Sequence, residues 1–200
     1  IFYHIHSPPF DAKLNFLRQY PKARLIMMVR EPIQSCESWV QKPFQANDYS
    51  TVVHRIIKML FDIDQVPFQT QESVGIRIED LKIQPEATIQ SICNWLGIDE
   101  VPSLYQMTSQ GKKWWGDPSS PDYNENSAMS PFDKTCLKRP IGAVFSETDQ
   151  FVLRTLFYPF NVAYGYLMPN SQQFERDLGE IPLLFENLLD FEKVLSKRLK

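Results

Sequence analysis

The sequence predicts an α/β fold in which a mainly parallel β-sheet is flanked by helices. Two short apolar runs, 23–29 and 74–78, are typical of strands that are buried on both faces, as strands of parallel sheets are. Segments with helical periodicity separate and follow these runs, and such alternation indicates a layered α/β architecture. The chain has 200 residues, of which 43% are hydrophobic, so it can bury one sizeable core. We therefore expect a single domain over residues 1–200.

The amino-terminal half contains further elements around these two runs. Residues 1–6 alternate in a way that predicts a strand, and residues 11–20 predict a short helix that ends at a proline. Pro32 stands where the first turn of the next helix would begin. Residues 51–63 predict another helix, whose apolar stripe includes Ile57 and Phe61.

The carboxy-terminal half alternates between clear helices and one long polar segment. The segment 85–97 begins with proline, ends with glycine and carries apolar residues at helical spacing between them, so it predicts a helix. Residues 101–140 are rich in Ser, Pro and Asn, and a long irregular segment of this kind is often a lid or substrate-binding loop. Residues 146–160 predict a helix with Ser146 as its cap. Residues 170–200 are expected to form the terminal helical segment, and the Leu-rich amphipathic pattern within it covers 181–199.

Composition excludes several classes of function. With 21 basic and 24 acidic residues the net charge is −3, which argues against nucleic acid as a partner, although a local phosphate site needs only a few placed donors. No apolar run approaches the ~18–20 residues of a membrane span. The three cysteines lack metal-type spacing, and two of them suit buried thiols. The first residues resemble neither an initiator segment nor a signal peptide and suggest the interior of a longer protein; compartment and oligomeric state stay open.

Arg30 and Ser38 are the first candidate binding residues. Arg30 follows a predicted strand and Ser38 lies about two turns into the next helix, so a guanidinium, a hydroxyl and a helix N-terminus with free amides could all face one phosphate. The alternative is structural: Arg30 would pair with Glu31 or Glu37, and Ser38 would be an ordinary helix-surface residue.

Three blocks of sequence, taken together, resemble the sulfotransferase superfamily that uses 3′-phosphoadenosine 5′-phosphosulfate. The segment Pro21–Pro32 followed by Ser38 is similar to the strand that ends in Arg-x-Pro, with a serine eight residues after the arginine. The segment Arg77–Leu81, with the helix over 85–97, resembles the Arg-Tyr-Glu-Asp-Leu block and its proline-initiated helix. Tyr164–Tyr166 is similar to the closing Leu-Gly-Tyr. The resemblance implies a P-loop nucleotide-hydrolase-like layered fold.

The resemblance also implies roles for particular residues. Arg30 and Ser38 would hold the 3′-phosphate of the donor, and His6, in a His-x-Pro element, would be the catalytic base, with His4 as the competing candidate. Gly111, Lys112 and Lys113 match a mobile loop that closes over the nucleotide. The neighbouring tryptophans could stack on a ring of the donor or acceptor, or they could simply anchor the loop.

The sequence departs from the family pattern in two places. Ile78 stands where the family commonly has tyrosine, so a contact near the adenine could be lost or rebuilt. The chain also has no glycine- and threonine-rich phosphate loop with its lysine, which normally precedes the histidine element. This suggests the carboxy-terminal portion of an enzyme, able to hold the 3′-phosphate but without an evident clamp for the phosphosulfate.

The predicted activity is transfer of a sulfuryl group from 3′-phosphoadenosine 5′-phosphosulfate to a hydroxyl or amine of a small-molecule or glycan acceptor, without a metal. One alternative is a non-catalytic, sulfotransferase-like binding or scaffold protein that lost the phosphate loop. A relative of nucleotide or shikimate-type kinases is a third possibility, for which only Glu79 and Asp80 offer an acidic site after a strand.

Overall fold

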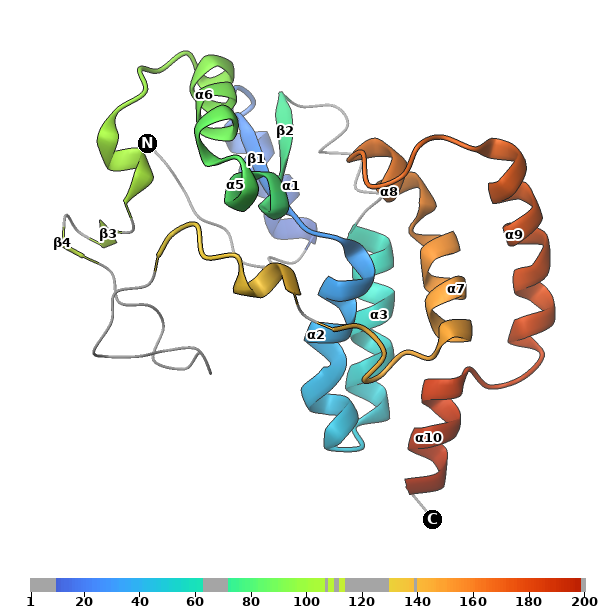
Figure 1. The fold of residues 1–200 in the computed structure, drawn as a ribbon. Helices are drawn as coiled ribbons and strands as arrows, with labels where there is room; N and C mark the ends of the chain where they lie inside the picture. The colour runs from blue at the N-terminus through green and yellow to red at the C-terminus, as the bar shows by residue number, and fades with distance from the viewer. Residues whose placement is uncertain are drawn as a thin grey trace. The chain divides into compact units, whose positions relative to one another are not determined.

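The computed structural model describes most of the chain, and its elements are labelled in Figure 1. Two compact units are present, and each is described by itself. The larger unit contains the described residues of 1–27, 31–75 and 141–200, and the smaller unit contains those of 28–30 and 76–140. The described residues are 10–62, 72–106, 108–109, 112–113, 130–138 and 140–198. The predicted strand over 1–6 lies outside them.

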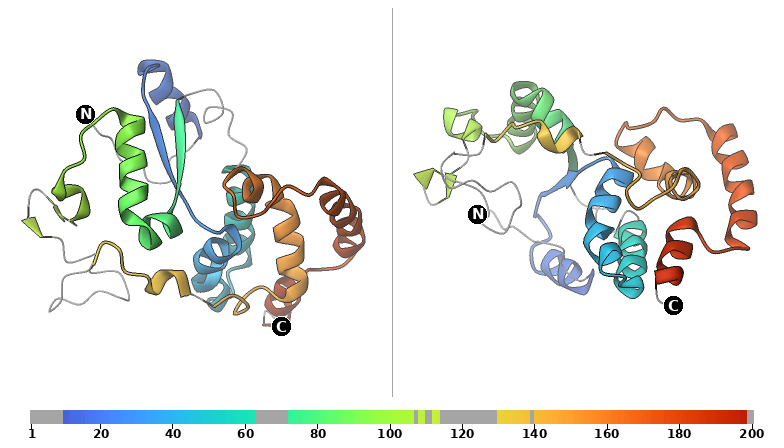
Figure 2. Two further views of the ribbon diagram at one scale, coloured as in Figure 1. Left: turned by 45° about the horizontal axis from the view of Figure 1, so that its top comes forward. Right: turned by 60° about the horizontal axis from the view of Figure 1, so that its bottom comes forward.

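The two predicted apolar strands are present and adjacent. β1 (Leu25–Val29) and β2 (Ser73–Arg77) form a small parallel sheet, in which the Leu25 amide donates to the Glu72 carbonyl at 2.9 Å. Figure 2 shows the strands side by side. The expectation of burial on both faces is wrong for β1, because Met28 is 54% exposed. The structure is helix-rich and compatible with an α/β fold, while the P-loop-like layered arrangement stays a prediction.

β2 ends one residue earlier than the apolar run suggests. Ile78 begins the short helix α5 (Ile78–Ile83), whose first turn carries Glu79 and Asp80. Acidic side chains stabilise the positive end of a helix, so they favour a helix start at this point over further strand.

The core of the larger unit is helical. α2 (Pro32–Gln45) packs against α3 (Tyr49–Asp62), and α7 (Glu147–Leu156) and α10 (Asp190–Arg198) contribute to the same core. Its fully buried or nearly buried members are Ile33, Cys36, Val40, Phe44, Val52, Ile56, Val144, Phe145, Leu153, Phe157, Phe191 and Leu195. Burial of Cys36 and of Cys93 confirms the expected buried thiols.

The predicted stripe of α3 is partly wrong. Ile57 is 46% exposed and Phe61 is 73% exposed, whereas Val52 and Ile56 are buried. The helix carries apolar residues on more than one face, so periodicity alone does not decide which of them faces α2.

Two predicted helices are each divided in the structure. The helix expected over 146–160 becomes α7 and α8 (Tyr158–Ala163), separated at Phe157. The terminal segment contains α9 (Ser171–Phe185), which lies beside α7, and then α10. Ser146 caps α7 as predicted, through a reciprocal pair of hydrogen bonds with Asp149. Among the described residues this unit also contains α1 (Phe10–Gln19), which matches the predicted short amino-terminal helix.

The smaller unit is built on α5 and α6 (Pro85–Leu96). Pro85 occupies the first turn of α6, and Gly97 ends the helix with a φ of 69°, which confirms the prediction for this segment. The described ends of the 101–140 segment form short 3₁₀ turns, η1 (Pro102–Tyr105) and η2 (Thr135–Lys138). The Lys82 ammonium donates to the Asp133 carbonyl at 2.8 Å, which ties α5 to the later of these ends. Within the described helices, none is long and apolar enough to cross a membrane.

Candidate functional site

Arg30 lies at the junction of β1 and α2, as the sequence predicts. β1 ends at Val29, Arg30 follows directly, and Pro32 opens the helix. Arg30 is half-buried. Its place in the chain puts a guanidinium at the carboxyl end of β1. Ligands of open α/β sheets bind at this end of the strands.

Arg77 marks the corresponding end of the neighbouring strand. Because β1 and β2 are adjacent and parallel, Arg30 and Arg77 follow the same edge of the sheet. The carboxyl ends of β1 and β2 therefore lie at one rim of the sheet. The guanidinium of Arg77 already has a partner, since it donates through Nε and Nη2 to the two carboxylate oxygens of Asp80 at 2.6 and 2.8 Å.

The Arg77–Asp80 pair bears on the kinase-like alternative. Both oxygens of Asp80 accept from the arginine fork, and such a forked contact is strong and directional. A divalent cation at Asp80 would have to compete with that arginine for the carboxylate oxygens. The described residues contain no group of three or more His, Cys, Asp or Glu side chains that could hold a metal ion.

Ser38 is a half-buried residue in the second turn of α2. The N-terminus of the same helix differs from the expectation of free amides. Pro32 has no N–H, and the Gln34 amide donates to the carboxylate of the cap residue Glu31 at 2.6 Å. A carboxylate therefore already occupies part of the positive end of this helix, and a bound anion would gain less from it than the sequence suggested.

The sequence did not predict that Glu37 is a buried residue that holds two parts of the chain together. It is only 4% exposed, and its two oxygens accept from the backbone amides of residues 142–145. This engagement disfavours Glu37 as the partner of Arg30 in the structural alternative. A signal was present in the sequence, because Glu37 lies four residues after Ile33 and three before Val40, on the apolar face of α2.

The other predicted site residues are His6, His4, Gly111, Lys112 and Lys113. His6, His4 and Gly111 lie outside the described residues. Lys112 and Lys113 form the strand β4 (Lys112–Lys113), which pairs antiparallel with β3 (Thr108–Ser109) in the smaller unit. The two lysines of the predicted nucleotide loop therefore lie in a short strand that pairs with β3.

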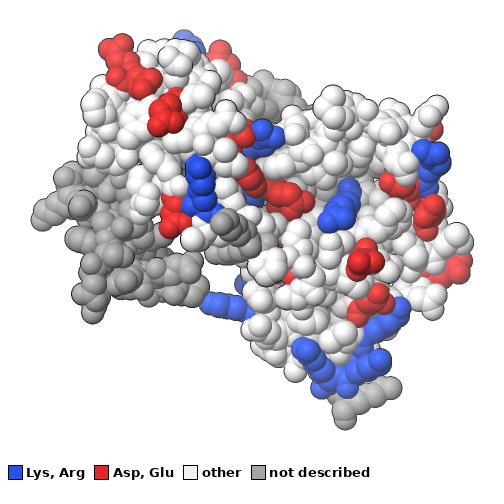
Figure 3. All heavy atoms as spheres, viewed as in Figure 1, with Lys and Arg blue, Asp and Glu red and all other residues white. Residues whose placement is uncertain are grey.

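Charge on the visible face of the molecule is mixed. Figure 3 shows both acidic and basic side chains of the described residues over most of that face, with basic side chains gathered at its lower end. Binding of a phosphate on this face would have to rest on a few placed donors and not on an extended basic field.

Comparison with known proteins gives one match. Residues 9–103 match a family model described as a sulfotransferase family. The matched region includes β1, α2, β2, α5 and α6, and with them Arg30, Ser38 and the Arg77–Leu81 block. No curated protein and no solved structure matches the chain significantly.

Proposed function

We propose that this chain, of which residues 9–103 match a sulfotransferase family model, transfers a sulfuryl group from 3′-phosphoadenosine 5′-phosphosulfate to a hydroxyl or amine of a small-molecule or glycan acceptor. The observation that carries the proposal is the junction of β1 and α2. Arg30 stands at the end of the strand, Ser38 stands two turns into the helix, and both fall inside the family match.

In this proposal Arg30 and Ser38 bind the 3′-phosphate of the donor. A guanidinium offers forked N–H donors to two phosphate oxygens, and a serine hydroxyl offers one more donor. Neither residue takes part in bond breaking. Their contribution is to position the donor so that its sulfur faces the acceptor.

His6 is proposed as the base, and His4 is the alternative. A neutral imidazole takes the proton of the acceptor hydroxyl while that oxygen bonds to sulfur. The bond between sulfur and the bridging oxygen of the 5′-phosphate breaks, and 3′-phosphoadenosine 5′-phosphate leaves with the electron pair. Gly111, Lys112 and Lys113 are proposed to cover the nucleotide.

Calorimetric titration of the full chain with 3′-phosphoadenosine 5′-phosphate tests the donor site. We expect Arg30→Ala and Ser38→Ala to weaken binding, with the larger effect for arginine, because a hydrogen bond to a charged group contributes about 1.5–3 kcal/mol, or roughly ten- to a hundredfold in affinity. Arg24→Ala is the matched control, since Arg24 directly precedes β1 at its other end and pairs with the exposed Glu72. This control should bind like the wild type.

A second ligand makes the test specific for the 3′-phosphate. Adenosine 5′-phosphate lacks that group, so its weaker binding should not change further in Arg30→Ala. Equal affinity of wild type and Arg30→Ala for 3′-phosphoadenosine 5′-phosphate would refute the assignment of Arg30. Transfer of radiolabelled sulfate to an acceptor panel separates an enzyme from a scaffold protein that binds the nucleotide without turnover.

A further inference from the structure

Glu37 is a buried carboxylate that joins two distant parts of the chain within the larger unit. It lies on α2, and its Oε1 and Oε2 both accept from the Gly142 amide at 3.0 Å. Oε1 also accepts from the amides of Ala143 and Val144 at 2.7 and 3.3 Å, and Oε2 accepts from that of Phe145 at 3.4 Å. Four consecutive backbone N–H groups thus converge on one side chain.

The carboxylate of Glu37 is costly to bury, and its hydrogen bonds to backbone amides offset that cost. Transfer of an ionised carboxylate out of water is costly, and among the described residues no ion pair includes Glu37. An apolar side chain at this position would leave the four backbone amides of residues 142–145 without this acceptor, which costs stability in a buried site. What the carboxylate adds is direction, because charge-assisted hydrogen bonds are strong and geometrically restrictive.

Both sides of this contact are held firmly. Phe145 is fully buried and Val144 is 7% exposed, and they pack in the same core as Ile33 and Val40 of α2. Ser146, the next residue, caps α7. The hydrogen bonds of Glu37 therefore fix both the rotation of α2 about its axis and its position along that axis, relative to the start of α7.

We propose that Glu37 is a positioning residue for the donor site and acts through Ser38. The two residues are neighbours on α2, so their side chains leave the helix about 100° apart, and Glu37 can hold the backbone segment while Ser38 faces another direction. Fixing the rotation of α2 fixes the direction in which the Ser38 side chain leaves the helix, and so restricts where its hydroxyl can lie. This inference rests on the proposed function, in which that hydroxyl binds the 3′-phosphate.

The test is a double-mutant cycle of Glu37→Gln and Ser38→Ala, read by calorimetric titration with 3′-phosphoadenosine 5′-phosphate. Glutamine keeps the shape but loses the charge and one acceptor. We expect Glu37→Gln to weaken binding on the order of tenfold, by analogy with the losses seen when the hydrogen-bond partners of metal-ligating residues are removed. In the Ser38→Ala background the same change should have almost no further effect, because an effect transmitted through one hydroxyl vanishes without it.

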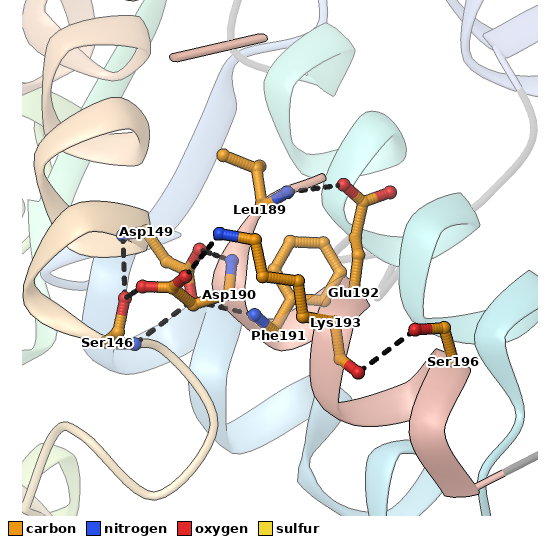
Figure 4. A network of polar contacts seen from close by, with 8 residues as sticks. All are labelled: Ser146, Asp149, Leu189, Asp190, Phe191, Glu192, Lys193 and Ser196. Carbon is orange, nitrogen blue, oxygen red and sulfur yellow. Dashed lines mark hydrogen bonds and ion pairs between the residues drawn. The ribbon is translucent and has the colours of Figure 1, made fainter. Parts of the chain in front are cut away.

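Asp149→Asn is the matched control. Asp149 is also fully buried and accepts from backbone amides, those of Ser146, Asp190 and Phe191, as Figure 4 shows. Both variants should unfold at lower urea concentration than the wild type, but only Glu37→Gln should bind the nucleotide more weakly at a temperature where circular dichroism shows all variants folded. If Glu37→Gln does not fold, Gly142→Ala loosens the same contact from the other side, because Gly142 has a φ of 113°.

The outcomes separate this inference from the proposed function. Absence of nucleotide binding by the wild type, or unchanged binding by Ser38→Ala, contradicts the proposed function. A Ser38 effect together with wild-type affinity in Glu37→Gln overturns only the positioning role. An equal loss for Glu37→Gln with and without Ser38 also overturns it, since the effect would then be a general one.

Discussion

The ring of Tyr164 occupies the space that a side chain at Gly75 would need. A Cβ atom at Gly75 would lie 2.0 Å from Cε1 and 2.7 Å from Cδ1 of Tyr164. Gly75 is in the middle of β2, and Tyr164 directly follows α8. Burial raises the pKa of the Tyr164 phenol, and the ring also contacts Phe160 at 4.6 Å between centroids. Tyr164, which follows α8, therefore packs against β2 at the point where Gly75 has no side chain.

Gly75→Ala should destabilise the protein by about 1–3 kcal/mol, because an added methyl group in a filled space forces neighbours to move. Urea unfolding at pH 7 measures the loss. Gly179→Ala is the control, since Gly179 lies in α9 and a methyl group added there would meet no atom within 4 Å. That variant should gain up to about 1 kcal/mol from helix propensity. Equal stability of Gly75→Ala and wild type would contradict the tight contact.

Asp149 should make stability depend on pH with a defined sign. Burial raises the pKa of this carboxyl above its ordinary value, although the backbone hydrogen bonds from Ser146, Asp190 and Phe191 act to lower it. The folded state therefore binds the proton more tightly than the unfolded state, so this group contributes more stability as the pH falls through its folded pKa. The neighbouring Asp190 has a lowered pKa because of its hydrogen bonds with Lys193 and Ser146, so it stays ionised in that range.

The variant Asp149→Asn has no titratable side chain at this position. It should lose about 1–3 kcal/mol at pH 7 by leaving amide donors unpaired, and the difference from wild type should grow between pH 7 and about pH 4. Asp48→Asn provides a control of opposite sign. Hydrogen bonds from Thr51 lower the pKa of Asp48, so its contribution is lost on acidification. Urea unfolding at several pH values measures both, and a constant difference for Asp149→Asn would refute the assignment.

Cys36 should be unreactive in the folded protein. Burial, with the negative charges of Glu37 and Glu31 nearby, raises the pKa of its thiol to about 12. At pH 8 the reactive thiolate is then roughly one part in ten thousand, and the side chain is 0% exposed. Iodoacetamide labelling followed by peptide mass spectrometry should find Cys36 unmodified in buffer and modified in 8 M urea. Rapid labelling of the folded chain would contradict its place in the core.

The ion pairs at the two sheet ends should differ in strength. Arg77 and Asp80 form a forked contact with side chains about one-third exposed, whereas Arg24 and Glu72 meet through one 2.7 Å contact and are 41% and 69% exposed. We expect Asp80→Asn to lower the free energy of unfolding by about 0.5–1 kcal/mol and Glu72→Gln to change it by nearly zero. Unfolding in low and high salt measures both. A larger loss for Glu72→Gln would reverse this ranking.

Local signals in the sequence were sufficient for several elements. The helix over 85–97 follows from a proline at its start and a glycine at its end, which act on the backbone directly. The strand that ends before Arg30 follows from a continuous apolar run between polar residues. The place of Arg30 at the end of a strand and of Ser38 in the next helix is therefore predictable, because each depends only on neighbouring residues.

Helix breaks and burial within helices were less predictable. The helix break at Phe157 and the exposed Phe61 both lie in sequences with ordinary helical patterns. Which apolar face is buried depends on the element that packs against it, and a single helix does not contain that information. The backbone amides that hold Glu37 are 105 to 108 residues away in the chain, beyond the reach of any periodicity argument.

The sequence by itself determined the resemblance to sulfotransferases, the strand that ends at Arg30 and the helix that carries Ser38, because these depend on local backbone preferences and on the order of short motifs. Only the tertiary structure decided that Glu31 occupies the N-terminus of α2, that Asp80 holds Arg77 and that Glu37 anchors α2 to residues 142–145. The physical reason is that a buried or charged group takes whichever partner the fold brings within hydrogen-bonding distance.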